Sequence, residues 1–237
     1  MSTFVLVHGA WHGAWCWHKV IPLLRQQGHT VIAPDLPGHG IDRTALATIT
    51  LDAYARRIAD ILDAEEHPVT LVGHSMGGAV ISLAAELHPD RIRKLVYLAA
   101  VLPRTGQTLF DILGMIAGEN IAGNLVVSAD QASSSFKPES IRDIFYADCS
   151  DEDVALAETT LTPQSLVPFA EAISVTPEKW GSLPRVYIEC LLDNAIRVED
   201  QRRLHQFYGC QQIIQMNASH SPFFSMPHEL ADHLLSL

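Results

Sequence analysis

The stretch TLVGHSMGGAV, from Thr70 to Val80, decides the fold that this sequence predicts. Its first half is an apolar run typical of a buried strand, and its second half is a run of small residues with helical spacing. Gly73, Gly77 and Gly78 surround Ser75, and such small residues allow a sharp turn with neighbouring backbone close by. The stretch therefore predicts a strand-to-helix corner that exposes the Ser75 hydroxyl.

Apolar runs and amphipathic segments alternate on both sides of this corner. The predicted strands lie within residues 4–9, 30–35, 68–74, 93–102, 184–193 and 211–218. The predicted helices lie within residues 20–29, 51–67, 76–90, 198–209 and 228–237. Nearly continuous apolar strands separated by amphipathic helices are typical of a mostly parallel sheet that helices cover on both faces, so the fold class is α/β.

The alternation stops after Leu102 and returns at about residue 183. Between these points the chain has Gly, Ser and Pro interruptions and helical pieces such as 151–160 and 165–173, without a clear strand. We therefore expect one α/β core formed by residues 1–102 and 183–237, with residues 103–182 inserted as a helical lid, or cap.

Composition and charge limit the function classes. The 237 residues carry a formal net charge of −11, which argues against a nucleic-acid or anionic-membrane partner. No apolar run approaches the roughly 20 residues that span a bilayer, and no export signal precedes residue 4. Four scattered cysteines suit reduced thiols. These features predict a soluble cytoplasmic protein, with both a monomer and a homodimer left open.

Ser75 lies within Gly73-His74-Ser75-Met76-Gly77, which fits the G-x-S-x-G pattern of a nucleophile at a strand-to-helix corner. A serine hydroxyl needs a base and a group that orients the base, and on this fold they follow in the order serine, acid, histidine. Of the late histidines, His220 follows a predicted strand, whereas the others fall on predicted helices: His205, His228 and His233. Among the late acids, Asp193 likewise ends a strand, whereas Glu189 falls inside it and Glu199 and Asp200 sit on a charged helix.

Acyl transfer at Ser75 would also need donors for an oxyanion. The backbone N–H groups of Met76 and of Ala10, in the loop HGAWHGAW after the first strand, are the predicted pair. His8, His12 and His18 in and after this loop lack a carboxylate partner, so we expect them to pack or form hydrogen bonds and expect no metal or cofactor.

Four longer stretches carry a resemblance to a known family. They are the opening FVLVHGAWHGAWCWHKVIPLLRQQGHTVIAPDLPGHG, the corner LVGHSMGG, and the runs CSDEDVALAETTLTPQSL and WGSLPRVYIECLLDNAI. The chain resembles the α/β-hydrolase branch of plant methylesterases of the salicylate-binding type and hydroxynitrile lyases, and it is similar to bacterial carboxylesterases, including pyrethroid-cleaving ones. The resemblance implies Ser75, Asp193 and His220 as the triad and the Ala10 and Met76 amides as the oxyanion hole.

The same branch offers a second chemistry. Its plant lyases carry a threonine where this chain has Gly9, and a lysine after the catalytic histidine where this chain has Ser221. Without that cation a departing cyanide would lack its electrostatic stabiliser, so an esterase is favoured over a lyase. Perhydrolase-type chemistry on the same triad, and a ligand-binding receptor on a hydrolase scaffold, remain alternatives.

The expected function is therefore a serine carboxylesterase for small-to-medium hydrophobic or aromatic esters, with a small-molecule ester as partner. Small-molecule sites are usually apolar, and the predicted lid is rich in apolar side chains. The residues predicted to contact substrate are Gly9, Trp11, Phe110, Phe136, Phe145 and Leu161.

Overall fold

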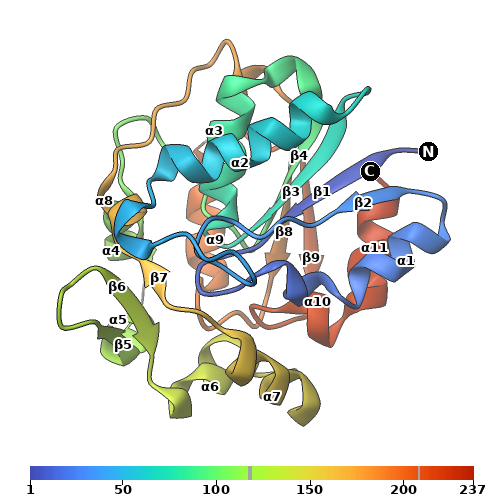
Figure 1. Cartoon of the computed structure of the whole chain (residues 1–237). Coiled ribbons are helices and arrows are strands. Elements are labelled where there is room, and N and C mark those ends of the chain that lie inside the picture. Colours follow the sequence, from blue (N-terminus) through green and yellow to red (C-terminus); the bar gives the residue numbers. More distant parts are fainter. Residues whose placement is uncertain (117–118, 208) are drawn as a thin grey trace.

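A parallel sheet runs through the centre of the molecule with the strand order β2-β1-β3-β4-β8-β9 (Figure 1). The computed structural model describes residues 1–116, 119–207 and 209–237. The strands of the sheet are β1 (Thr3–Val7), β2 (Thr30–Ile32), β3 (Val69–His74), β4 (Ile92–Leu98), β8 (Arg185–Cys190) and β9 (Gln212–Met216). Each pair of neighbours is parallel, as the near-continuous apolar runs predict.

Helices cover both faces of this sheet. α1 and α11 pack against each other, and α2 and α3 pack together on the other side of the strands in Figure 1. The helices outside the insertion are α1 (Val20–Gln26), α2 (Leu51–Ala64), α3 (Gly77–Leu87), α9 (Val198–Gln206), α10 (Pro222–Ser225) and α11 (Pro227–Leu235). α2 begins where the Thr50 side chain accepts a hydrogen bond from the Ala53 N–H, which satisfies one of the unpaired donors of the first turn.

The insertion, residues 103–182, connects β4 to β8 along the chain, and these two strands pair in the sheet. Its secondary structure differs from the all-helical prediction. It contains the helices α4 (Leu109–Ile116), α5 (Glu119–Asn124), α6 (Ile141–Phe145), α7 (Asp151–Thr160) and α8 (Val167–Ala170). It also contains an antiparallel sheet of β5 (Leu125–Val127), β6 (Ser133–Phe136) and β7 (Gln164–Ser165), which the sequence did not predict. These strands are only two to four residues long; β5 is wholly apolar, whereas β6 and β7 are mostly polar, so none shows the apolar alternation that marks a strand in a sequence.

The core lies between the sheet and its helices, and it positions the loops. All six residues of β3 are buried, and Leu6, Val72, Val96 and Val186 align across the four central strands. Because the strands are parallel, the loops after β1, β3, β8 and β9 emerge at the same edge of the sheet. No helix in the described ranges is long and apolar enough to cross a bilayer.

Candidate active site

The corner at Ser75 has the strained geometry that the sequence predicts. Ser75 has φ of 53°, a left-handed conformation that costs energy for a residue with a side chain. Its carbonyl oxygen accepts hydrogen bonds from the N–H groups of Gly78 and Val101, each at 3.0 Å. A Cβ atom at residue 73 would lie 2.6 Å from the Gly77 carbonyl oxygen, so glycine is required there. These contacts hold the serine between β3 and α3.

His220 and Asp193, the predicted base and acid, meet at the same edge of the sheet. The His220 Nδ1 donates to the Asp193 Oδ2 at 2.7 Å, and both side chains are buried. The Asp193 Oδ1 accepts the N–H groups of Ala195 at 2.7 Å and Ile196 at 2.9 Å. Because the carboxylate accepts the proton on Nδ1, the other ring nitrogen of His220 is free to act as a base.

The predicted rivals of these two residues have other partners. His205 contacts the Glu189 Oε1 through Nε2 at 2.8 Å, and Asp200 pairs with Arg197 and Arg203 within the first turns of α9. His228 and His233 lie in α11. The structure therefore brings Asp193 and His220 together, as their strand-end positions predict, and leaves the rivals outside this pair.

His74 joins the base to the corner, a link that the sequence did not reveal. Its Nε2 donates to the His220 carbonyl oxygen at 2.8 Å, and the two imidazole rings lie 4.6 Å apart. Burial, together with the nearby His220, lowers the pKa of His74 well below its ordinary value. His74 is thus a neutral side chain that fixes the backbone of the base directly beside Ser75.

Ala10 and Met76, whose amides are the predicted oxyanion donors, line the same pocket as Ser75. Among the described residues, neither N–H donates to a protein group. His8 explains the direction of the Ala10 N–H: its Nε2 accepts the Leu36 N–H at 3.1 Å, so its Nδ1 donates to the Gly9 carbonyl oxygen at 2.8 Å. A trans peptide aims its N–H opposite to its C=O, so holding the Gly9 carbonyl also orients the Ala10 N–H.

The other histidines near this loop form hydrogen bonds. Buried His12 contacts the Ala10 carbonyl oxygen through Nδ1 at 2.8 Å, and exposed His18 contacts the Trp15 carbonyl oxygen at 3.1 Å. Burial lowers the pKa of His8 well below its ordinary value and lowers the pKa of His12 to about 4. In the described residues, no group of three or more His, Cys, Asp or Glu side chains could hold a metal ion.

A narrow apolar pocket lies against Ser75, between the core and the insertion. Its free volume is about 30 Å³, on the order of one water molecule. The core contributes Ala10, Trp11, Ser75, Met76, Val101, Ala195 and Ile196, and the insertion contributes Leu109, Leu113, Ile121, Phe145 and Phe169. Ser75 supplies the one side-chain hydroxyl in this lining, so the pocket favours uncharged groups.

Comparison with known proteins identifies the family of this chain. The profile of the alpha/beta hydrolase family matches residues 4–233, almost the whole chain. The chain belongs to the alpha/beta hydrolase family.

This hydrolase is similar to two curated relatives and to one solved structure. It is 36% identical over 250 residues to the putative chloroplastic methylesterase 11 of Arabidopsis thaliana, covering 100% of this chain and 64% of that protein. It is 36% identical over 245 residues to the pyrethroid hydrolase of Sphingobium wenxiniae, covering 98% and 86%. The crystal structure of a pyrethroid hydrolase from Sphingobium faniae JZ-2 superposes with a TM-score of 0.89 at 32% identity, covering 99% and 96%.

The predicted substrate contacts of the hydrolase divide in two. Trp11 and Phe145 line the pocket, whereas Gly9, Phe110, Phe136 and Leu161 are absent from its lining. Phe136 packs edge-on against Trp11 at 4.7 Å between ring centroids and lies behind it. Phe110 is 43% exposed and contacts Phe169, and Leu161 packs against the core. Gly9 lies under the corner, since a Cβ there would be 2.8 Å from the Ser75 Cβ.

The lining residues outside the predicted set are Val101, Leu109, Leu113, Ile121, Phe169, Ala195 and Ile196. A signal existed for Ala195 and Ile196, since they directly follow the predicted acid in the same loop. The sequence also did not reveal a role for Gln201. This residue lies in α9, and its side-chain amide donates to the Asp193 Oδ2 at 3.2 Å.

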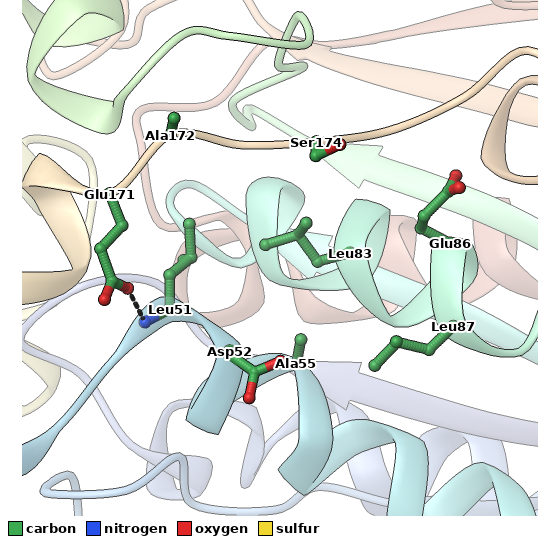
Figure 2. A pocket seen from close by; sticks show the side chains of 9 residues that line it. All are labelled: Leu51, Asp52, Ala55, Leu83, Glu86, Leu87, Glu171, Ala172 and Ser174. Carbon is green, nitrogen blue, oxygen red and sulfur yellow. Dashed lines mark hydrogen bonds between the residues drawn. The ribbon is translucent and has the colours of Figure 1, made fainter.

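A wider groove of the hydrolase lies away from Ser75, where α2, α3 and residues 171–174 meet (Figure 2). Its volume is about 400 Å³, and its lining shares no residue with the pocket at Ser75. Its carboxylates support the fold: Glu171 accepts the Leu51 N–H at the start of α2, and Glu86 accepts the Thr176 N–H at 2.8 Å. Among the described residues that line the groove there is no histidine, whereas the pocket at Ser75 lies beside the His220–Asp193 pair.

Proposed function

We propose that this hydrolase is a serine carboxylesterase that cleaves neutral carboxylic esters with hydrophobic or aromatic parts. The observation that carries the proposal is the buried Asp193–His220 pair, whose side chains lie 2.7 Å apart. His74 donates to the His220 carbonyl oxygen and directly precedes Ser75, which has a strained backbone and lines an apolar pocket. This arrangement supports nucleophilic catalysis, because it supplies a base, an orienting acid and a hydroxyl held away from the sheet.

The first half of the reaction acylates Ser75. The Ser75 Oγ attacks the ester carbonyl carbon as the His220 Nε2 accepts its proton, and Asp193 stabilises the resulting imidazolium. The Ala10 and Met76 N–H groups face the developing oxyanion, and such donors typically contribute about 3 kcal/mol each. The start of α3 adds a favourable dipole at Met76. His220 then protonates the departing alkoxide, which leaves as the alcohol.

The second half releases the acid. Water enters the space that the alcohol vacates, and His220 accepts its proton as the water attacks the acyl carbon. The Ser75 Oγ leaves with that proton, and the free carboxylic acid departs. Protein groups supply each proton transfer in this scheme.

The pocket supports uncharged substrates of limited size. Its lining is apolar apart from Ser75, and a buried substrate charge would find no partner there. The free volume of about 30 Å³ is far below the several hundred Å³ of typical ligand sites, so a bulky ester must displace side chains such as Leu109 and Leu113 of α4. Two relatives named a methylesterase and a pyrethroid hydrolase are consistent with ester substrates.

Two features favour the esterase over a hydroxynitrile-lyase reaction. Ser221 follows the base where the lyases have lysine, so no cation adjoins His220 at this position. A side chain at residue 9 would collide with the Ser75 Cβ at 2.8 Å in the present backbone, so the threonine of the lyases does not fit.

The test is hydrolysis of p-nitrophenyl acetate and butyrate by the wild type, Ser75→Ala and His220→Ala, with mandelonitrile cleavage alongside. We expect ester turnover by the wild type and a loss of at least about 10³-fold in both variants, as for other serine nucleophiles and bases. Turnover that survives Ser75→Ala would refute the proposal. Cyanide release without ester turnover would indicate a lyase, and saturable binding without either would indicate a receptor.

A further inference from the structure

One short segment of the insertion touches three of the loops that carry the site. This segment, residues 143–149, comprises the end of α6 and the turn before α7 (Figure 1). Its contacts reach residues 9–12 after β1, residues 193–196 after β8 and residues 219–221 after β9. The pocket-lining helix α4 is a separate part of the insertion.

The contact with the first loop runs through Tyr146 and His12. The buried Tyr146 hydroxyl lies 2.6 Å from the His12 Nε2, and the His12 Nδ1 donates to the Ala10 carbonyl oxygen at 2.8 Å. A carbonyl can only accept, so Nδ1 carries the proton of the neutral ring and Nε2 accepts from Tyr146. Burial raises the pKa of Tyr146 well above its ordinary value, which keeps this hydroxyl a donor. The chain of hydrogen bonds therefore restrains Ala10, whose N–H is a predicted oxyanion donor, from its carbonyl side.

The contact with the base loop runs through Asp148. Its Oδ2 accepts the Ser219 N–H at 2.8 Å, and its Oδ1 accepts the Ser219 hydroxyl. Ser219 immediately precedes His220. A carboxylate that accepts two hydrogen bonds from one residue restrains both its backbone and its side chain. Asp148 therefore limits the movement of the base along the pocket.

The third contact joins the acid loop. The Asn194 side-chain amide donates to the Asp143 carbonyl oxygen at 2.7 Å, one residue after Asp193. Between these contacts Phe145 lines the pocket and lies 5.7 Å from the His220 ring, centroid to centroid. The segment thus reaches the loops of the donor, the base and the acid within seven residues.

We propose that Tyr146 and Asp148 are positioning residues that set the relative placement of the Ala10 amide and the His220 imidazole; this rests on the proposed serine-esterase function. Neither group reacts with substrate. Catalysis by fixed donors depends on their being in place before the transition state forms, and a misplacement of about 1 Å can cost about 10²-fold in rate. The insertion is then part of the catalytic framework as well as a cover for the pocket.

The test compares Tyr146→Phe and Asp148→Ala with two matched controls. Tyr97→Phe removes another buried hydroxyl, which contacts Ser82 at 2.8 Å and Trp180 at 2.8 Å, distant in the chain from the three loops. Asp130→Ala removes another insertion carboxylate that accepts a serine hydroxyl, at 2.6 Å, and a backbone N–H, at 3.1 Å. The readouts are kcat and KM for p-nitrophenyl acetate and the Ki of a trifluoromethyl ketone, which forms an oxyanion on Ser75.

We expect kcat to fall about 10-fold in Tyr146→Phe and Asp148→Ala, with KM within about twofold and the Ki of the ketone raised in proportion to the loss in kcat. Asp148→Asn keeps one acceptor for the Ser219 N–H and should fall between the wild type and Asp148→Ala. The controls should keep kcat and Ki while losing thermal stability. A KM effect with unchanged kcat, or equal kcat losses in the controls, would overturn the proposal.

A second readout does not depend on turnover. Hydrogen–deuterium exchange of peptides spanning residues 8–14 and 217–222 should rise in Tyr146→Phe and Asp148→Ala respectively, and stay at the wild-type rate in the controls. Unchanged exchange would overturn the positioning role even in an active enzyme. If wild-type turnover does not depend on Ser75, the proposed function fails, and the exchange data alone decide whether the segment holds the loops.

Discussion

Replacing Asp193 with asparagine should disable the base through its tautomer. The Asp193 Oδ1 accepts two backbone N–H groups, from Ala195 and Ile196, and the Oδ2 accepts the His220 Nδ1 proton. In Asp193→Asn, the single remaining oxygen stays with the two backbone donors, because they have no other acceptor among the described residues. The Gln201 amide, which also donates to Oδ2 at 3.2 Å, keeps the carbonyl oxygens of Cys190 and Ile196 as acceptors. The NH₂ then faces His220.

This orientation reverses the roles of the two ring nitrogens. His220 must accept at Nδ1, so its proton moves to Nε2, the nitrogen that should receive the proton of Ser75. The wrong tautomer in a comparable serine protease costs about 10⁴-fold in kcat, or roughly 5.4 kcal/mol of barrier at 1.36 kcal/mol per tenfold. We therefore expect kcat for p-nitrophenyl acetate to fall about 10⁴-fold at pH 7, with little change in KM.

The matched control is Asp200→Asn. Asp200 is also buried, but it pairs with Arg197 and Arg203 and contacts neither ring nitrogen of His220. Its variant should keep kcat within a few-fold of the wild type while losing stability. A loss of less than 10-fold in Asp193→Asn, or an equal loss in Asp200→Asn, would refute the assignment of Asp193 as the orienting acid.

Three further outcomes follow from the buried histidines, the corner and the pocket. Burial holds the pKa of His12 at about 4, so between pH 6.5 and 4 the unfolded chain binds a proton that the folded chain does not. His12 alone should lower the free energy of unfolding by about 2 kcal/mol between pH 7 and 4.5 in urea titrations, and His12→Gln should flatten that slope. Gly9→Ala should lower kcat about 10-fold or more, because its Cβ would lie 2.8 Å from the Ser75 Cβ, whereas Gly123→Ala, with open space around it, should not. Leu113→Ala should widen the pocket and raise kcat/KM for p-nitrophenyl hexanoate over acetate about 10-fold; an unchanged ratio would argue against Leu113 as a wall of the acyl site.

The sequence predicted the core and the meeting of Asp193 with His220 because both depend on local patterns. An apolar run predicts a buried strand, and a polar residue at the end of such a run predicts its edge of the sheet. Asp193 and His220 each stand at the end of a strand after Ser75, so chain order and strand position were enough to choose them.

Other features depend on contacts between distant residues. β6 is mostly serine, and its position is fixed by pairing with β5 and β7 and by the Trp11 Nε1, which donates to the Ser134 carbonyl oxygen at 3.0 Å. Tyr146 meets His12 across 134 positions of the chain, so no local pattern could show that bond. Phe136 and Ile121 are both buried and apolar, and only the packing of the insertion decides that Ile121 lines the pocket.

The insertion divides its contacts between two stretches, and this division bears on how such an enzyme can diversify. Leu109, Leu113 and Ile121 lie in α4 and α5 and line the pocket, whereas Tyr146 and Asp148 lie in residues 143–149 and contact the loops. Phe145, beside Tyr146, is the residue of the second stretch that also lines the pocket, and it packs near His220. Mutations in α4 and α5 can reshape the pocket for a new substrate, while Tyr146 and Asp148 keep the reacting groups in place. Selection for new substrates should therefore accumulate changes in α4 and α5 and preserve Tyr146 and Asp148, so that descendants differ in what they accept and agree in how they react.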